Sequence, residues 1–413
     1  MLKKKQILDK LFFCIILNLI PIGLLGMFHI PTKIYTILFG IVYTIQTLIL
    51  IFYTSQNYEK IPQKMILLWM IIILNCCLTI SYDVIKFGTI DHNEIIFSCS
   101  LIINILILII GMNKQEITKE ELQLFLKKMT ILGIIAAIIN LILNYKLMFN
   151  LSSLTNSYSA NFSSFFPNRN QYGIFMLIMI ISLSLLIHLK YEKKYIIYYL
   201  IFIANLILSM SRNAILALII FFGMLIYFKY IKGKKRITKN KAFFYFLGLV
   251  ILIIAISFCY NNSNVNKLIN KLFIRADSLE SGSGRFTVWK NGLLIFSKYN
   301  PLVGVGRYKA IELNKSLFGS DLEYFHSLYI EKMAEHGIIG LITLLFLFKF
   351  VWNKIKFSNI DINMKNILKS AFVCFAIISI FETTTRFSIG YADTMALIFF
   401  FTFIILVSNL KEN

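Results

Sequence analysis

Residues 171–189 read QYGIFMLIMIISLSLLIHL, a run without a single Asp, Glu, Lys or Arg. A helix needs about 20 apolar residues to cross the hydrocarbon core of a bilayer, so this run predicts a transmembrane helix. The rest of the chain has the same character: of its 413 residues 58% are hydrophobic and 15% charged, and the mean hydropathy is +0.74. Soluble chains are about a quarter charged. The composition excludes soluble, disordered, collagen-like and disulfide-scaffold proteins and indicates a polytopic membrane protein.

Twelve apolar runs approach or reach the length of a transmembrane span. They cover residues 11–29, 35–53, 65–82, 94–112, 129–149, 171–189, 195–211, 213–230, 243–260, 336–352, 368–382 and 392–409. We therefore predict an all-α polytopic membrane protein with about 12 transmembrane helices and one large, mainly helical extracytoplasmic loop. Residues 1–260 would hold helices 1–9, residues 261–335 the loop, and residues 336–413 helices 10–12.

The basic residues predict the orientation of these spans. The net charge is +22, from 42 basic and 20 acidic residues, which in a soluble protein would suggest nucleic acid. In membrane proteins, however, basic residues gather in cytoplasmic loops. With the N-terminus inside, 26 of the 42 basic residues fall on the inner side, and 10 of the other 16 lie in the long segment 261–335. Long translocated segments are exempt from this rule, so both termini are predicted to be cytoplasmic, and no nucleic-acid partner is expected.

The segment 261–335 is too rich in aromatic and apolar residues to be disordered. Its sequence predicts helices at about 263–275, 284–297 and 321–335. The turn NPLVGVG, residues 300–306, separates the last two because Pro and Gly interrupt regular structure.

The arginines are distributed unlike the lysines. The chain has 35 Lys and only seven Arg, and six of the seven fall on the predicted outer side. These six are Arg169, Arg212, Arg275, Arg285, Arg307 and Arg386. A guanidinium binds phosphate or carboxylate with two parallel hydrogen bonds, so such a group beside the bilayer indicates a site for a lipid-borne phosphate. The alternative is a set of scattered solvated residues or headgroup anchors.

Individual polar residues carry weaker signals. Arg212 lies in SMSRNA, residues 209–214, where two apolar runs meet with almost no loop, so its charge requires a partner or a wet cavity. Glu382 and Arg386 are four residues apart and are expected to form a simple ion pair. His326 would share a helical face with Tyr329, and an isolated histidine of this kind is more often packed than catalytic.

Several chemistries are disfavoured. The sequence has no D-x-D, Walker A, H-E-x-x-H or G-x-S-x-G motif. Its six cysteines all fall inside apolar runs, which is typical of buried small hydrophobes. Neither a metal nor any other cofactor is expected, and the substrate would arrive already activated.

Five motifs, taken in order, resemble those of the O-antigen ligase/polymerase superfamily, the WaaL and Wzy integral-membrane glycosyltransferases. They are FPNRNQYG (166–173), SMSRNA (209–214), GRFTVW (284–289), NPLVGVG (300–306), and HSLY (326–329) followed by EHGIIG (335–340). Ser327 stands where many relatives carry Asn. The resemblance covers residues 166–345, and the first 150 residues match only as apolar spans.

The resemblance implies transfer of a glycan from undecaprenyl pyrophosphate to an acceptor hydroxyl on the outer face of the cell membrane. Arg212 and Arg285 are similar to the family arginines thought to hold the pyrophosphate, and His326 to a histidine acting near the acceptor or leaving group. These three are the expected catalytic residues. The expected substrate-binding residues are Asn168, Arg169, Asn170, Ser211, Trp289, Arg307 and Tyr329.

The motifs alone leave the reaction open. We favour a polymerase of capsule, exopolysaccharide or O-antigen repeat units, because the Lys-, Ile- and Asn-rich composition suits a mobile polysaccharide cluster or a Gram-positive host. The alternatives are a ligase acting on lipid A-core, a lipid-linked oligosaccharide flippase, and a structural partner that only organises an export complex. The expected partners are a lipid-linked glycan donor, a glycan acceptor, membrane lipids, a chain-length regulator and a flippase.

Overall fold

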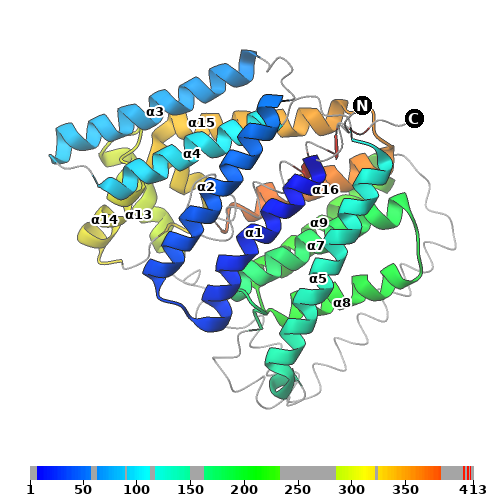
Figure 1. Ribbon diagram of the computed structural model, residues 1–413. Helices are drawn as coiled ribbons and strands as arrows, with labels where there is room; N and C mark the ends of the chain where they lie inside the picture. The colour runs from blue at the N-terminus through cyan, green and yellow to red at the C-terminus, as the bar shows by residue number, and fades with distance from the viewer. Residues whose placement is uncertain are drawn as a thin grey trace.

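The computed structural model describes residues 7–56, 63–88, 91–111, 117–148, 162–232, 285–320 and 324–382, together with 403, 404, 407, 408 and 410. Within these residues the secondary structure is helical (Figure 1), and the one β-type pairing described is an isolated bridge between Ile117 and Leu410. The all-α fold class is confirmed for this part of the chain. The predicted span 243–260, most of the predicted span 392–409, the predicted helix 263–275, Arg275 and Arg386 lie outside the described residues.

The described helices coincide with ten of the twelve predicted apolar runs. They are α1 (Ile7–Phe28), α2 (Thr32–Gln56), α3 (Gln63–Phe87), α4 (His92–Gly111), α5 (Lys119–Met148), α7 (Arg169–Leu189), α8 (Lys194–Leu208), α9 (Arg212–Ile226) continuing into the π-helix η1 (Tyr227–Lys232), α15 (Leu328–Phe357) and α16 (Ile362–Ile378). Six helical stretches of the described residues, lying in α1, α3, α5, α7, α9 with η1, and α15, are long and apolar enough to cross a membrane. The chain is thus a multi-pass membrane protein, and the number of twelve spans stays a prediction.

Contacts between helices show which helix ends lie together. The backbone N–H of Leu328, at the start of α15, donates to the carbonyl of Ser379, just after the end of α16, at 2.9 Å. At the opposite end of the bundle, Lys128 pairs with Asp9 at 2.7 Å and His188 with Asp361 at 2.8 Å. We call the first end the loop end, because α13 (Arg285–Lys298) and α14 (Arg307–Phe318) lie there, together at the left of Figure 1.

Helix α7 forms the centre of the bundle. It contacts α5, α8, α9 and α16, and 78% of the residues in its most apolar stretch are buried inside the protein. The surrounding helices expose large aliphatic side chains instead, such as Leu200, Ile219 and Ile342. In water such exposure would be unfavourable, whereas lipid tails are as apolar as these side chains. The arrangement therefore has a protein core around α7 and a lipid-facing periphery.

Helix α15 is interrupted at Gly337, whose φ of 63° and ψ of −161° are not helical. The turn 300–306 fills this break: Val305 and Gly306 N–H groups donate to the carbonyls of Ala334 and Glu335 at 3.1 and 2.9 Å. In return, the N–H groups of Ile338 and Ile339 donate to carbonyls of the same turn. Two motifs separated in the sequence, NPLVGVG and EHGIIG, are therefore hydrogen-bonded to one another.

The predicted helix 284–297 is confirmed as α13. The predicted helix 321–335 is wrong at residues 324–327, because α15 begins only at Leu328 and His326 has a left-handed φ of 52°; residues 321–323 lie outside the described part of the chain. His326 therefore does not share a helical face with Tyr329. Helix α14 was not predicted, since it is a largely polar helix without an apolar run.

Candidate functional site

The turn between α8 and α9 places two polar side chains at the loop end. Met210 adopts a left-handed φ of 52°, and Ser211 then caps α9, its hydroxyl accepting from the N–H of Ala214 at 3.4 Å. Arg212 and Asn213 are the first two residues of α9. A helix N-terminus presents unpaired N–H groups and the positive end of the helix dipole, so this position favours an anion.

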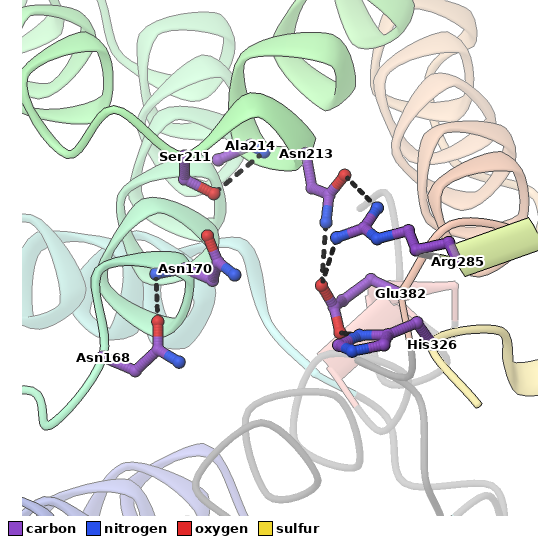
Figure 2. A network of polar contacts seen from close by, with 8 residues as sticks. All are labelled: Asn168, Asn170, Ser211, Asn213, Ala214, Arg285, His326 and Glu382. Atoms are coloured by element: carbon purple, nitrogen blue, oxygen red, sulfur yellow. Dashed lines mark hydrogen bonds and ion pairs between the residues drawn. The ribbon is translucent and has the colours of Figure 1, made fainter. Parts of the chain in front are cut away.

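Four side chains from distant parts of the chain meet beside this turn, and we call them the Glu382 network (Figure 2). Asn213 Nδ2 donates to Glu382 Oε2 at 2.8 Å. Arg285 donates from Nη1 to Asn213 Oδ1 and from Nη2 to Glu382 Oε2, both at 3.4 Å. His326 Nδ1 lies 3.4 Å from the other carboxylate oxygen, Oε1. One carboxylate thus connects the starts of α9 and α13, the segment before α15 and the segment after α16.

The network is partly shielded from solvent. The relative solvent exposure of the side chain is 12% for Glu382, 19% for His326 and 26% for Arg285. Reduced hydration strengthens electrostatic interactions, while this remaining exposure lets a ligand reach the guanidinium and the imidazole. These properties suit a site that binds a charged group and moves a proton.

Local contacts fix the backbone that carries His326. The N–H of the preceding Phe325 donates to Glu331 Oε1 at 3.0 Å, and both residues are buried. The Phe325 ring packs where α13 has Gly292, since a Cβ there would approach it at 3.0 Å. On the other side, the Tyr324 ring meets the imidazole edge-on at 4.6 Å. These contacts hold a non-glycine residue in an otherwise disfavoured left-handed conformation.

The predicted binding residues at the start of α7 lie near this turn. Asn168 caps α7, its side-chain oxygen accepting from the N–H of Asn170 at 2.7 Å, and Arg169 is the first residue of the helix and half-buried. Figure 2 shows Asn168 and Asn170 beside Ser211, apart from the Glu382 network. They line the same end of the bundle without joining the network.

Trp289 and Tyr329 differ in what their polar atoms can do. Trp289 lies one turn after Arg285, with its ring 6.1 Å from that of Phe381. Its buried Nε1 has no hydrogen-bond partner among the described residues. The hydroxyl of Tyr329 already donates to the carbonyl of Ala376 at 2.8 Å, and it therefore ties α15 to α16.

Arg307 lies in a different cluster. It is buried, with its guanidinium 5.2 Å above the ring of Phe97 and 3.9 Å from Glu335 Oε1. Lys332 also pairs with Glu335, at 3.2 Å, and the N–H of Tyr308 donates to Glu94 at 2.8 Å. These contacts support a structural role for Arg307, which holds α14 against α4 and α15.

Sequence reasoning missed two members of the network. Glu382 was expected only to pair with Arg386, which lies outside the described residues. No role was predicted for Asn213. A carboxylate within the predicted span 368–382 was the available signal, since charges near hydrocarbon are costly and usually functional. Among the described residues, no group of three His, Cys, Asp or Glu side chains is placed to hold a metal ion.

Comparison with known proteins gives one family match, which covers about a third of the chain. Residues 197–345 match the model of a family described as O-antigen ligase. The matched stretch contains Arg212, Asn213, Arg285 and His326, and Glu382 lies beyond it. No curated protein matches the chain. The family match confirms the predicted resemblance to the O-antigen ligase/polymerase superfamily, and it supports a membrane glycosyltransferase of that type.

Proposed function

We propose that the protein polymerises oligosaccharide repeat units carried on undecaprenyl pyrophosphate. In this reaction a hydroxyl of one lipid-linked unit attacks the anomeric carbon of another. The bond from that carbon to the pyrophosphate breaks, and undecaprenyl pyrophosphate leaves. The observation that carries the proposal is the Glu382 network, in which Arg285 and His326 share one carboxylate.

The arginines would stabilise the leaving group. A departing pyrophosphate gains negative charge, and preorganised donors in a poorly hydrated site stabilise charge where it develops. Arg285 keeps 26% exposure of its side chain, so its planar fork can meet two phosphate oxygens. Arg212, in the first turn of α9, adds its own charge to the positive end of that helix.

His326 would accept the proton of the attacking hydroxyl. Glu382 faces Nδ1 of the imidazole at 3.4 Å, and a carboxylate in this position favours the tautomer that is protonated on Nδ1. The other ring nitrogen, Nε2, is then the basic one, and it takes the hydroxyl proton as the new glycosidic bond forms. Since the leaving group is already activated, no metal or other cofactor is required.

The other predicted contacts fit this arrangement to different degrees. Asn168, Arg169, Asn170 and Ser211 border the site and are proposed to bind the donor. Trp289 offers an indole N–H and a ring face to a sugar. Tyr329 and Arg307 would act through the helices they hold rather than by touching substrate.

We further propose that the site faces the outside of the cell membrane. The described residues 117–128, 190–194 and 349–369, which carry several lysines, lie at the end of the bundle opposite the Glu382 network. Basic loops mark the cytoplasmic side. This orientation would place both termini inside and would allow a flippase to supply the donor and a chain-length regulator to control the product.

Incubating the purified protein with the lipid-linked repeat unit tests the proposal, with the products separated on a sizing gel. We expect a ladder that is lost in Arg285→Ala and His326→Ala, retained in Lys315→Ala on the exposed face of α14, and unchanged by a chelator. A ladder that survives both site substitutions would contradict the proposed site.

The second candidate is the ligase, which the description of the matching family favours. It predicts no ladder but transfer of the glycan when lipid A-core is added. If neither product forms, movement of the lipid-linked unit across vesicle membranes becomes the test of the flippase alternative.

A further inference from the structure

Both ends of α13 are fixed to ends of membrane-spanning helices. At its start, Arg285 contacts Asn213, the second residue of the candidate span Arg212–Ile231. Just after its end, the carbonyl of Tyr299 accepts from the hydroxyl of Tyr82 at 2.9 Å, and the Tyr299 ring lies 6.0 Å from that of Phe87. Tyr82 and Phe87 belong to the last turns of the candidate span Gln63–Phe87.

These contacts set the level of the whole helix. The 14 residues of α13 extend over about 21 Å at the usual helical rise, and both of its ends lie where spanning helices end at the loop end. Helix α13 therefore runs at the level where these candidate spans end and does not project away from them.

The two faces of α13 are unlike each other. Val288, Asn291, Gly292 and Ile295 are buried against the protein. The other face exposes large apolar side chains, with Phe286 at 58%, Leu293 at 42% and Leu294 at 41%. Its exposed lysines are Lys290 and Lys298. Because Phe286, Lys290 and Leu293 are spaced by four and three residues, they form one stripe along the helix.

This combination is unfavourable in water and favourable in the headgroup region of a membrane. Helices that lie in the interface bury Phe and Leu among the upper acyl chains while Lys reaches the phosphates. Lysines near an anionic membrane surface add electrostatic attraction to this apolar burial. We infer that the exposed face of α13, made of Phe286, Lys290, Leu293, Leu294 and Lys298, rests in the headgroup region of an anionic bilayer. Resting on the proposed function, this contact would also hold Arg285 at the depth of a lipid-linked pyrophosphate.

Spin-label accessibility tests the inference without any activity assay. The native cysteines of the full-length protein are first replaced, and a nitroxide is attached at Leu293→Cys in proteoliposomes of phosphatidylglycerol and phosphatidylcholine. Leu345→Cys, on the exposed face of α15, is the lipid control, and Lys193→Cys, in the exposed turn between α7 and α8, is the aqueous control. We expect the label at 293 to be several-fold more accessible to oxygen than to a water-soluble nickel chelate, with a depth between the two controls.

Two outcomes would overturn the inference. Accessibility to the nickel chelate equal to that at residue 193 would mean that this face is in water. Inaccessibility to both reagents would mean that protein, either another part of this chain or a second copy, covers it.

The contribution of the lysines is tested by replacing the phosphatidylglycerol, so that the vesicles contain phosphatidylcholine alone. We expect a shallower label at residue 293, and an unchanged depth would refute the anionic part of the inference. Because none of these readouts uses the lipid-linked donor, they stand even if the polymerase assay fails.

Discussion

The imidazole Nδ1 of His326 lies 3.4 Å from the carboxylate Oε1 of Glu382, although 56 residues separate them in the sequence. The other oxygen of the same carboxylate accepts from Asn213 and Arg285. Glu382 is thus shared between the group proposed to take a proton and the group proposed to hold pyrophosphate. Any change in its charge should disturb both at once.

Glu382→Gln tests this relationship. The amide keeps the shape and one acceptor oxygen but loses the charge that orients His326 and Arg285. We expect polymer formation to fall by roughly 100-fold, the lower end of what a positioned proton acceptor contributes. Initial rates of ladder formation measure the effect. Glu312→Gln is the matched control, because the Glu312 side chain lies on the exposed face of α14. Wild-type rates in Glu382→Gln would show that the carboxylate is only structural.

Arg285→Lys should be far more damaging than its conserved charge suggests. The two terminal nitrogens of Arg285 donate to two different residues, and a lysine ammonium cannot reproduce that planar fork. We expect a loss of roughly 100-fold in turnover at saturating donor, and Arg212→Lys should likewise lose most activity. Lys315→Arg serves as the control. Near-normal turnover in both arginine variants would exclude two-point binding of the phosphate.

Glu331 is predicted to act on His326 without touching substrate. Its Oε1 accepts the N–H of Phe325 at 3.0 Å, and Gln can keep this acceptor while Ala cannot. Glu331→Ala should therefore lower kcat with little change in the donor KM, whereas Glu331→Gln should restore most of kcat. Leaving the buried N–H without an acceptor should also cost about 1–3 kcal/mol of stability. Equal kcat values for the two variants would refute the positioning role.

The sequence predicts those features of the fold that depend on local hydrophobicity. Helix α7 follows from its uncharged run because crossing a bilayer requires about 20 apolar residues. Helix α14 has no such run, and its position depends on contacts with α4 and α15. The non-helical backbone of His326 depends on Glu331, six residues from the N–H it accepts.

The centre of the site depends on contacts between residues that are even further apart in the sequence. Asn213 and Glu382 are 169 residues apart, and no periodicity or motif in one sequence indicates that they meet. The motifs identified Arg285 and His326 as separate candidates. Only the fold shows that one carboxylate joins them.

Asp361 makes stability at the opposite end dependent on pH. Partial burial opposes its ionisation, but hydrogen bonds from the N–H groups of Asn363 and Met364 and the nearby His188 outweigh this and lower the pKa of Asp361. Because the folded pKa lies below the unfolded value, the carboxylate stabilises the fold above the unfolded pKa of about 4. This contribution is lost as the pH falls further, through the lowered pKa.

Thermal unfolding of Asp361→Asn in detergent measures this contribution. We expect a lower Tm than wild type at pH 7, by the equivalent of about 1 kcal/mol for a weakened helix cap. The difference should shrink as the pH falls below about 4. A difference that does not vary with pH would mean that the charge of Asp361 is not involved.

Gly337→Ala should disrupt the joint between α15 and the turn 300–306. Gly337 has a φ of 63°, and a Cβ there would collide with the backbone of Leu302. The left-handed conformation alone costs a non-glycine residue about 1–3 kcal/mol, and the collision would break the hydrogen bonds that fill the helix break. We expect a lower Tm and loss of the ladder, because α15 carries Glu331, which holds the backbone next to His326.

The matched control is Gly223→Ala in α9, where a Cβ would meet nothing within 4 Å. This change should raise stability by about 0.4–1 kcal/mol. If both variants unfold at the same temperature, the turn does not hold α15 in place.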